Sequence, residues 1–482
     1  MVRPGARVVV AGIGVAGYAA ADALVDLGAR VVVLDGRDDD RNRERAAVLE
    51  VLGADVRLGA GAADAMPDDV ELVVTSPGWR PTSAVLEQAV LRGVPVWGEV
   101  ELAWRLRPRR ADGTYAPWLA VTGTNGKTTT VQMLDAMLRA AGVRSTAVGN
   151  VGTPVLEAVR DPDLYDVLAV ELSSFQLHTT WSMSAQAAVV LNVAPDHLDW
   201  HGSFEAYRAA KARVYQRAQL ACVYPLADAV VEPMVRDADV VDGCRAVGFT
   251  DGVPPVGAVG VVDGVLVDRA FADDLAEPAL ELGSVDAIHP LAPHTLADAL
   301  AAAALARAHG VPVEAVGAGL RSFRLDEHRG GDVVGAPGPV RWVDDSKATN
   351  PHAARAALLA HPAAQSVVWI AGGLAKGAAF DELVTGVRDR LRGAVLIGRD
   401  REVLAEALRR HAPEVRVIEV GAGETGPEVM DRAVAAALGL AEPGDTVLLA
   451  PACASQDLFR DYAERGDAFA AAVRTHTRAA PN

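Results

Sequence analysis

Short apolar runs alternate with amphipathic segments along this chain, a pattern typical of strands and helices that follow one another. Within the first hundred residues, apolar runs at 7–11, 30–35, 70–75 and 94–97 predict strands, and residues 18–27 predict a helix. A glycine-rich loop at 12–17 separates the first strand from that helix. This order predicts a Rossmann-like N-terminal domain.

Two further segments of the chain show the same alternation of apolar runs and amphipathic segments. An arginine- and proline-containing segment at 105–117 predicts a linker to a second α/β domain, which begins with a strand at 118, gains β-rich turns over 237–286 and closes with a helix at 295–309. Apolar runs at 340–344, 366–371, 394–397 and 446–450 predict the strands of a third domain. We therefore expect an α/β protein of three domains, at residues 1–112, 113–325 and 326–482.

Composition narrows the class of protein. The net charge is −17, from 46 Lys and Arg against 63 Asp and Glu, which disfavours nucleic acid and anionic membranes as partners. No apolar run approaches the roughly 18 residues of a membrane helix, and no secretory signal is visible. The three cysteines show no CxxC spacing, so neither a disulfide framework nor a zinc site is expected. We expect a cytoplasmic protein without membrane insertion.

The segment 121–130, VTGTNGKTTT, carries the strongest chemical signal. Gly123 and Gly126 allow the backbone to approach phosphates at the start of an amphipathic helix. Lys127 can reach the β- and γ-phosphates, and the Thr128 hydroxyl is placed to bind Mg²⁺. Val121 stands where the usual P-loop pattern has glycine. The intact Gly-Lys-Thr core still predicts a nucleotide triphosphate site and a P-loop ATPase-like central domain.

The first glycine loop, Gly12 to Gly17, is ambiguous. With Asp35 at the end of the next strand it matches a dinucleotide fingerprint. A second phosphate loop would be superfluous in a simple dehydrogenase, so we favour the diphosphate of a nucleotide sugar, held by the same N–H groups at a helix N-terminus. NAD(P) and close packing alone remain alternatives.

Polar residues follow two further strands of the central domain. Glu171 ends the apolar run 167–170, where a carboxylate can bind the Mg²⁺ that bridges ATP phosphates. His197 lies in the polar loop 192–201 that follows another apolar run. Its position near a parallel strand end favours a metal or substrate role. Lys211 lies in a mixed helix, and its local sequence predicts a solvated side chain.

Three polar loops follow strands of the third domain, at 344–350, 372–377 and 451–457. Loops that end neighbouring strands form a site for a small charged molecule. Thr349, Lys376 and Ser455 are therefore candidates to hold carboxylates, and loop capping is the alternative for each of them.

These motifs together resemble those of the Mur ligase family. The family loop TGTNGK[ST]T is present at 122–129, and ELSSFQL at 171–177, DSKATN at 345–350 and PACAS at 451–455 extend the resemblance across all three domains. The resemblance implies an ATP-dependent ligase that adds D-glutamate to UDP-N-acetylmuramoyl-L-alanine through an acyl phosphate in peptidoglycan precursor synthesis. Alternatives are a sister ligase adding another amino acid such as L-glutamate, and a catalytically weak nucleotide-binding regulator.

The resemblance also assigns site residues. It implies a UDP-substrate site at Gly14, Val15, Ala16, Gly17, Asp35, Arg37, Ser76, Pro77, Gly78 and Asn150. It implies an ATP site at Gly123, Thr124, Asn125, Gly126, Lys127, Thr128, Thr129, Arg329, Asp345 and Lys347. Two Mg²⁺ ions would be held by Thr128, Glu171, His197 and a carbamylated Lys211. D-Glutamate would be bound by Thr349, Lys376, Ser455 and Tyr462. His328 or a nearby carboxylate is expected to orient the attacking amine or accept its proton, and we expect the protein to be a monomer.

Two departures from the family pattern change what is expected. The family usually has His-Asn-x-x-Asn where this chain has His294, Thr295 and Asp298. Both asparagines that would approach the nucleotide are therefore replaced, which leaves the adenine contacts open. Leu374 also replaces a commonly polar residue beside Lys376, a change that bears on the amino-acid pocket.

Overall fold

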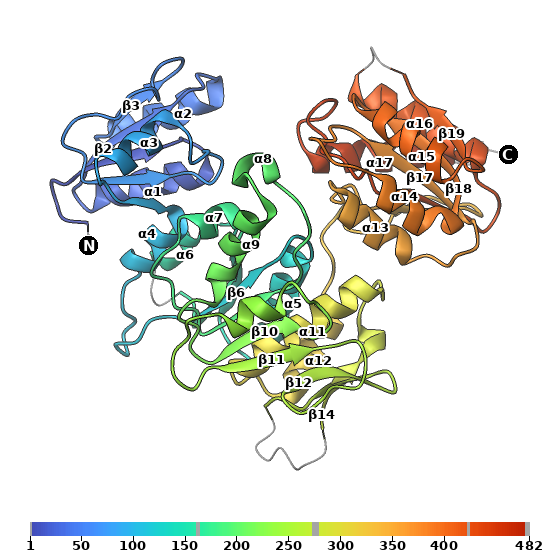
Figure 1. Ribbon diagram of the computed structural model, residues 1–482, viewed down its shortest axis with the longest axis horizontal. Coiled ribbons are helices and arrows are strands. Elements are labelled where there is room, and N and C mark those ends of the chain that lie inside the picture. Colours follow the sequence, from blue (N-terminus) through green and yellow to red (C-terminus); the bar gives the residue numbers. More distant parts are fainter. Residues whose placement is uncertain (1, 161–163, 272–278, 422–424, 478–482) are drawn as a thin grey trace. The chain divides into compact units, whose positions relative to one another are not determined.

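The computed structural model describes residues 2–160, 164–271, 279–421 and 425–477. The chain forms two compact units (Figure 1): Met1–Ile288 with Thr295–Phe323, and His289–His294 with Arg324–Asn482. The first unit carries two sheets and the second unit carries one. The three sheets have largely parallel strands that alternate with helices along the chain, which confirms the predicted α/β fold class.

A five-stranded parallel sheet in the order β3-β2-β1-β4-β5 forms the N-terminal part of the first unit. The predicted strands are confirmed to within two residues, whereas the short, half-exposed β3 was not predicted. The order reverses beside β1, where the loop between β1 and α1 lies. The elements are β1 (Arg7–Ala11), α1 (Val15–Asp26), β2 (Arg30–Asp35), α2 (Asp40–Val51), β3 (Asp55–Leu58), β4 (Leu72–Thr75), α3 (Ala84–Leu91), β5 (Val96–Gly98) and α4 (Glu99–Leu106).

The second sheet has nine strands in the order β14-β13-β12-β11-β10-β9-β6-β8-β7. It is parallel from β7 to β12 and antiparallel at β13 and β14, which fall in the predicted β-rich segment. Its strands are β6 (Trp118–Thr122), β7 (Ser145–Gly149), β8 (Val167–Glu171), β9 (Ala187–Val190), β10 (Ala221–Pro225), β11 (Arg245–Phe249), β12 (Ala258–Val262), β13 (Val265–Asp268) and β14 (Leu280–Ser284).

Helices cover this central sheet. The alanine-rich α11 is buried along most of its length, because small side chains allow close packing against the sheet. The helices are α5 (Lys127–Ala140), α6 (Val155–Val159), α7 (Ser174–His178), α8 (Leu198–His201), α9 (Phe204–Ala212), α10 (Glu232–Arg236), α11 (Pro293–Ala308) and α12 (Val313–Ser322), with 3₁₀ turns η1 (Arg213–Tyr215) and η2 (Val285–Ala287). Among the described residues, no helix has the length and apolarity needed to cross a bilayer.

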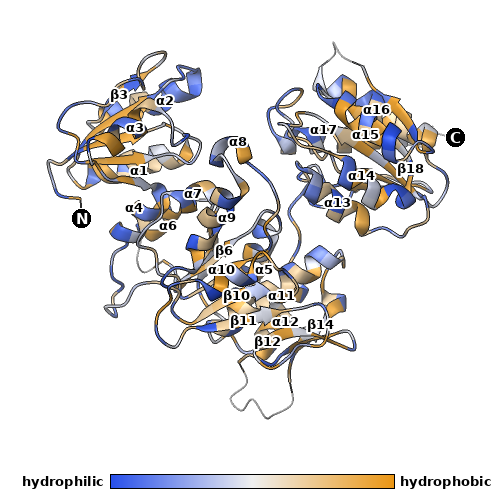
Figure 2. Ribbon diagram, viewed as in Figure 1, coloured by the Kyte–Doolittle hydropathy of each residue, from blue (hydrophilic) through white to orange (hydrophobic). Residues whose placement is uncertain are grey.

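The second unit holds a six-stranded sheet in the order β15-β16-β20-β17-β18-β19. Separate apolar cores lie on its two faces, and Figure 2 shows its strands largely in the hydrophobic colour while its helices carry both colours. Its elements are β15 (Gly331–Asp332), β16 (Arg341–Asp344), α13 (Pro351–Leu359), β17 (Val367–Gly372), α14 (Asp381–Val387), η3 (Arg388–Arg390), β18 (Leu391–Ile397), α15 (Arg401–His411), β19 (Arg416–Glu419), α16 (Gly426–Leu440), β20 (Thr446–Leu449) and α17 (Tyr462–Thr477).

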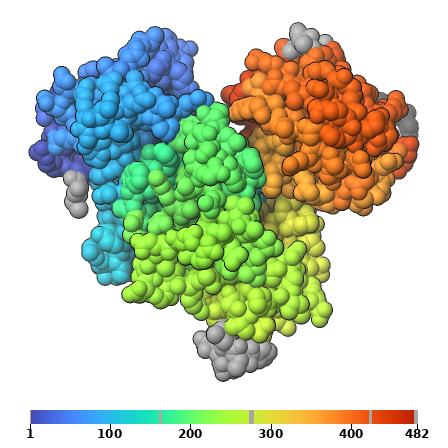
Figure 3. Space-filling view, in the orientation of Figure 1, coloured from blue at the N-terminus to red at the C-terminus, as the bar shows by residue number. Residues whose placement is uncertain are grey.

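Two buried glutamates on α4 tie the N-terminal sheet to the central sheet within the first unit. Glu101 is fully buried, and its carboxylate accepts hydrogen bonds from the Trp181 and Ser182 backbone N–H groups at 2.7 and 2.8 Å. Glu99 accepts the Leu156 N–H at 2.6 Å. Figure 3 shows the blue N-terminal part and the green part as one continuous surface. These hydrogen bonds join α4 to the segments of the chain that carry Leu156, Trp181 and Ser182.

We predict that Glu99→Gln raises the melting temperature more at pH 8 than at pH 5. Burial raises the pKa of Glu99 to about 7, so the loss of stability grows as the pH rises from the unfolded-state pKa toward 7, is complete at pH 8 and is still small at pH 5. The difference is worth about 3 kcal/mol at most. Gln keeps the acceptor for Leu156. Equal shifts at the two pH values in differential scanning fluorimetry would contradict this account.

Candidate functional site

The P-loop joins β6 to α5, as predicted, and two of its glycines lie close to neighbouring side chains. Gly126 has φ +85°, and a Cβ there would lie 2.2 Å from Asp298 Oδ1. A Cβ on Gly123 would lie 3.0 Å from Leu191 Cβ. The loop is therefore held closely against neighbouring elements, and its N–H groups stand at the N-terminus of a 14-residue helix.

Two lysines donate to one carbonyl of this loop. Lys127 Nζ donates to Gly123 O at 3.0 Å and to Thr124 O at 2.9 Å. Lys211 Nζ, from α9, donates to the same Gly123 oxygen at 2.7 Å. Lys211 is only 2% exposed, so the prediction of a solvated side chain was wrong. α9 turns Tyr207, Ala210 and Lys211 toward the protein interior.

The surroundings of Lys211 disfavour its charged form. Burial lowers its pKa well below the ordinary value, and the Lys127 ammonium lowers that pKa further, against the smaller opposing effects of Asp196 and Glu171. Tyr207 lies beside it, with its ring centroid 4.7 Å from Nζ and its hydroxyl 2.9 Å from Thr124 Oγ1. The result is a buried amine at the phosphate loop.

Glu171 is the last residue of β8 and is buried. Its Oε1 accepts a hydrogen bond from Asn150 Nδ2 at 2.8 Å. Its Oε2 is buried and has no hydrogen-bond partner among the described residues. An unpartnered carboxylate oxygen in the interior is costly unless a ligand or ion satisfies it. Asn150 is thus in direct contact with Glu171.

His197 follows β9, whose neighbours in the sheet place its loop beside the P-loop. The order β9-β6-β8 brings the ends of three parallel strands to one edge, and Thr124 N donates to Asn192 O at 3.0 Å. His197 has φ +53°, its side chain is 44% exposed, and Nε2 lies 3.7 Å from Asp196 Oδ2. Its ring stands 4.8 Å from that of Phe175. The loop therefore presents the imidazole outward at the site edge.

A group of aromatic and histidine side chains next to this loop was not predicted. His201 Nε2 lies 2.9 Å from Ser174 Oγ, and burial lowers the pKa of His201 to about 4. Phe175 stacks on His201 at 5.5 Å, and Trp200 lies 4.8 Å from Phe175. The sequence signal was the ring-rich run 197–201, which alone does not show what the rings pack against.

The N-terminal glycine loop is tightly packed. A Cβ on Gly17 would lie 1.9 Å from Gly12 O, which explains glycine at this helix start. Asp35 Oδ2 accepts the Ile13 N–H at 3.0 Å, and Oδ1 accepts the Arg37 N–H at 3.0 Å. Ser76 Oγ donates to Gly12 O at 3.4 Å. The structure therefore gathers the predicted residues of β1, β2 and β4 around one loop.

In the second unit, the three predicted loops end the adjacent strands β16, β20 and β17. The loops of β17 and β20 pair through Leu374 N to Ala454 O at 2.9 Å. Ser455 is 1% exposed, and its Oγ has no partner among the described residues. Lys376 has φ +49° in its loop. Lys347 Nζ lies 3.9 Å from the Tyr462 ring centroid.

His328 and Asp345 lie near the end of β16 in the same unit. His328 Nδ1 lies 2.7 Å from Asp344 Oδ2, and this hydrogen bond raises the pKa of His328. Burial and the charge of Asp344 raise the pKa of Asp345 to about 7. Arg329 Nε lies 3.9 Å from Asp326. The pairing with Asp344 favours the protonated form of the His328 imidazole.

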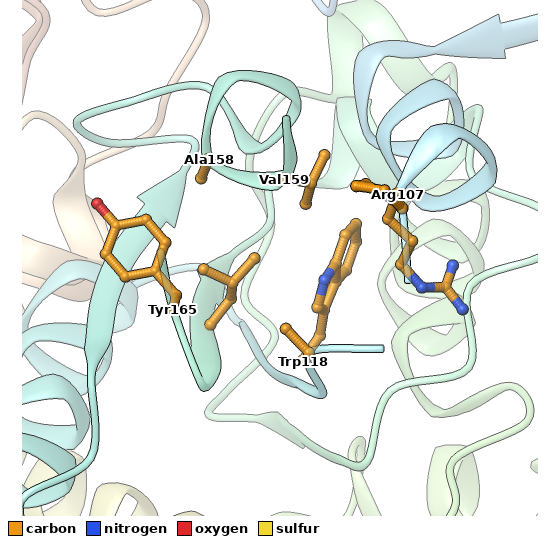
Figure 4. Close-up of a pocket in the computed structure, with 8 residues that line it drawn as sticks. Arg107, Trp118, Ala158, Val159 and Tyr165 are labelled. Atoms are coloured by element: carbon orange, nitrogen blue, oxygen red, sulfur yellow. The ribbon is translucent and has the colours of Figure 1, made fainter. Parts of the chain in front are cut away.

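A small cavity of about 20 Å³ lies at the opposite end of β6, lined by Arg107, Trp118, Val159 and Tyr165 (Figure 4). A volume of that size holds about one water molecule. It begins at the first residue of β6, whereas the P-loop follows the last. This cavity is therefore not the candidate site.

Comparisons with known proteins agree with this arrangement. Three family models match in order: "Mur ligase MurD-like, N-terminal domain" at residues 6–98, "Mur ligase middle domain" at 121–250 and "Mur ligase, glutamate ligase domain" at 331–453. The chain belongs to the Mur ligase family.

Curated relatives match this Mur ligase over its full length. The chain is 58% identical over 470 residues to the UDP-N-acetylmuramoylalanine--D-glutamate ligase of Streptomyces coelicolor, covering 98% of each chain. It is 54% identical over 475 residues to the ligase of that name from Thermobifida fusca, again covering 98% of each. It is 49% identical over 502 residues to that from Mycolicibacterium smegmatis, covering 98% of this chain and 97% of the relative.

Solved structures share the fold. UDP-N-acetylmuramate-alanine ligase MurC from Thermotoga maritima superposes with a TM-score of 0.57 at 19% identity, covering 98% of this chain and 99% of that one. MurF ligase from the same organism, in complex with ADP, gives 0.54 at 16% identity, covering 93% and 96%. At these identities the likeness supports the three-domain Mur ligase fold alone.

Asp298 is the departure from the family pattern with a visible structural consequence. It is 4% exposed, and Thr130 Oγ1 donates to its Oδ1 at 3.2 Å. The same oxygen lies against the Cα of Gly126. This Mur ligase therefore has the Asp298 carboxylate packed against its P-loop, at a position where the family usually has the neutral amide of asparagine. Thr295 is also buried, at 3% exposure.

We predict that Asp298→Asn lowers the KM for ATP about fivefold, because removing a charge that repels the phosphates is worth on the order of 1 kcal/mol. Asn keeps the acceptor for Thr130 and has nearly the same volume. Thr295→Asn, which restores the other family residue without a change of charge, is the matched control. An unchanged or higher KM for Asp298→Asn in a steady-state assay would show that the carboxylate does not oppose ATP.

Proposed function

We propose that this Mur ligase adds D-glutamate to UDP-N-acetylmuramoyl-L-alanine, with ATP as the driving substrate, in peptidoglycan precursor synthesis. The full-length relatives named for that reaction support the choice of substrates. The structural observation that carries the proposal is the convergence of Lys127, Lys211 and Glu171 at the edge of three adjacent parallel strands. This constellation suits phosphoryl transfer to a carboxylate.

The reaction needs activation because a carboxylate is a poor acyl donor. A carboxylate oxygen of the UDP-linked substrate attacks the γ-phosphorus of ATP, which gives an acyl phosphate and ADP. The amine of D-glutamate then attacks the acyl carbon, an amide bond forms and phosphate leaves. Lys127 supplies positive charge at the transferring phosphoryl group, together with the N–H groups of residues 123–129.

We propose that this site holds two Mg²⁺ ions. Thr128 and Glu171 would hold one ion, which fits the buried Glu171 Oε2 that has no partner among the described residues. His197 and a carbamylated Lys211 would hold the second ion. A neutral amine can add CO₂ to give a carbamate, and the lowered pKa of Lys211 favours the neutral amine. When bound, the ions would neutralise phosphate charge and orient the oxygens.

Most of the remaining residues are proposed for the two other substrates. Gly14, Val15, Ala16, Gly17, Asp35, Arg37, Ser76, Pro77 and Gly78 are proposed for the UDP moiety, which their clustering around one loop supports. Asn150 is proposed for the same substrate nearer Glu171. Thr349, Lys376, Ser455 and Tyr462 are proposed for D-glutamate, and the unpartnered Ser455 Oγ supports this choice.

Arg329, Asp345 and Lys347 are proposed for ATP. The raised pKa of His328 favours stabilisation of negative charge by an imidazolium over removal of a proton from the amine.

We also propose that the three domains span residues 1–112, 113–325 and 326–482. We propose that the protein is a monomer in the cytoplasm.

The test of this function is phosphate release with UDP-N-acetylmuramoyl-L-alanine, ATP and one amino acid at a time. We expect release with D-glutamate and formation of the corresponding amide by mass spectrometry. Release with L-glutamate or another amino acid alone would favour a sister ligase. No amide with any amino acid, despite ATP binding, would favour a nucleotide-binding regulator.

We predict that Lys127→Ala lowers kcat at least a hundredfold, because loss of one charge at the phosphoryl group costs roughly 3 kcal/mol of transition-state stabilisation. Arg139→Ala, at the far end of the same helix, is the control for general effects on α5. Turnover near wild type at saturating ATP would remove the P-loop assignment.

We predict that Lys211→Ala abolishes measurable turnover and that acetate at high concentration partly restores it, because a small carboxylate can enter the vacated space. Lys211→Arg should stay inactive, since guanidinium remains charged and cannot form a carbamate. Full activity of Lys211→Arg would show that only a cation is required beside Gly123.

A further inference from the structure

Arg465 on α17 is a cation buried in the second unit. It is 1% exposed, which places it among the largest fully buried side chains of the described residues. Its guanidinium donates three hydrogen bonds: to Ser346 Oγ at 3.0 Å, to Ser346 O at 2.8 Å and to Cys453 O at 3.1 Å. A hydroxyl and two backbone carbonyls, and no carboxylate, accept these bonds.

The accepting residues belong to two different loops. Ser346 lies in the loop after β16, and Cys453 lies in the loop after β20, the neighbouring strand of the sheet. The first loop carries Thr349 and the second carries Ser455, both proposed above for D-glutamate. Arg465 therefore connects the loops that the amino-acid site depends on.

A third link closes this network. Ser346 Oγ donates to Tyr462 O at 2.7 Å, so the start of α17 is joined to the β16 loop as well. The Tyr462 ring lies 3.9 Å from Lys347 Nζ. The Arg465 guanidinium joins the two loops to each other, and the Ser346 hydroxyl joins the β16 loop to the start of α17.

Burying the Arg465 charge costs free energy, so the need to fill space in the core does not explain why an arginine stands at this position. Burial lowers the pKa of Arg465 to about 10, and the group still carries its charge at neutral pH. An apolar side chain of similar volume would fill the same space without desolvating a cation. The planar fork, in contrast, directs three donors in a fixed geometry at acceptors on two loops, whereas an apolar side chain has no donor and a lysine presents its donors from a single nitrogen.

We infer that Arg465 is a positioning residue for the incoming amino acid: it holds loops 345–350 and 451–457 at the separation that D-glutamate needs. The inference rests on the proposed function, because it assigns the two loops to that substrate. Ser455 Oγ, buried and without a partner among the described residues, lies two positions after the Cys453 carbonyl that Arg465 holds. Displacement of this loop would move Ser455 directly.

The experiment compares Arg465→Lys with the wild-type enzyme in steady-state assays that vary each substrate. We expect the KM for D-glutamate to rise at least tenfold, and the KM for UDP-N-acetylmuramoyl-L-alanine to change less than twofold. Arg465→Ala should show the same split, and guanidinium ion at tens of millimolar should lower its KM for D-glutamate again. Arg392→Lys, whose ion pair with Asp445 lies at the opposite ends of the strands, is the matched control.

Equal rises in both KM values, or a lower melting temperature with unchanged KM values, would overturn the inference, as would a lack of guanidinium rescue. If neither Arg465 variant folds, Ser346→Ala removes one acceptor only, and an unchanged KM for D-glutamate in that variant would also overturn it. A wild-type enzyme that rejects D-glutamate contradicts the proposed function instead. The inference would then be judged by the KM of the amino acid that the wild type accepts.

Discussion

The Gly123 carbonyl, shared by the ammonium groups of two lysines, is the interaction on which the rest of the site depends. Lys127 reaches it from the P-loop helix and Lys211 reaches it from α9. Two cations on one oxygen repel each other, and Lys211 is also shielded from water. Both effects favour the neutral amine of Lys211, and carbamate formation requires a neutral amine.

Sheet topology brings the other groups to their places. In the first unit the order β9-β6-β8 aligns the loops of His197, the P-loop and Glu171 at one edge. In the second unit the order β16-β20-β17 aligns the three polar loops in the same way. Parallel strands place all their carboxyl ends on one side of a sheet. Each site is thus assembled from loops that are distant in sequence and adjacent across the sheet.

The sequence predicted the features that depend on local pattern. The P-loop was predicted because glycines, a lysine and hydroxyls stand together between a strand and a helix, and Glu171 because it ends an apolar run. Lys211 was wrongly predicted to be solvated, since burial of one face of α9 depends on what packs there. Arg465 was missed for the same reason: nothing in its helix shows that two loops bind its guanidinium. The half-exposed β3 lacked the apolar run of the other strands.

The central claim is that Lys211 carries a carbamate when the site is assembled. Carbon-13 NMR of the enzyme in ¹³C-bicarbonate, with Mg²⁺ and ATP, tests it directly. The account predicts one protein-bound carbamate resonance in the wild type and in Lys376→Arg, and none in Lys211→Arg. A resonance that survives Lys211→Arg, or its absence from active wild-type enzyme, would contradict the account.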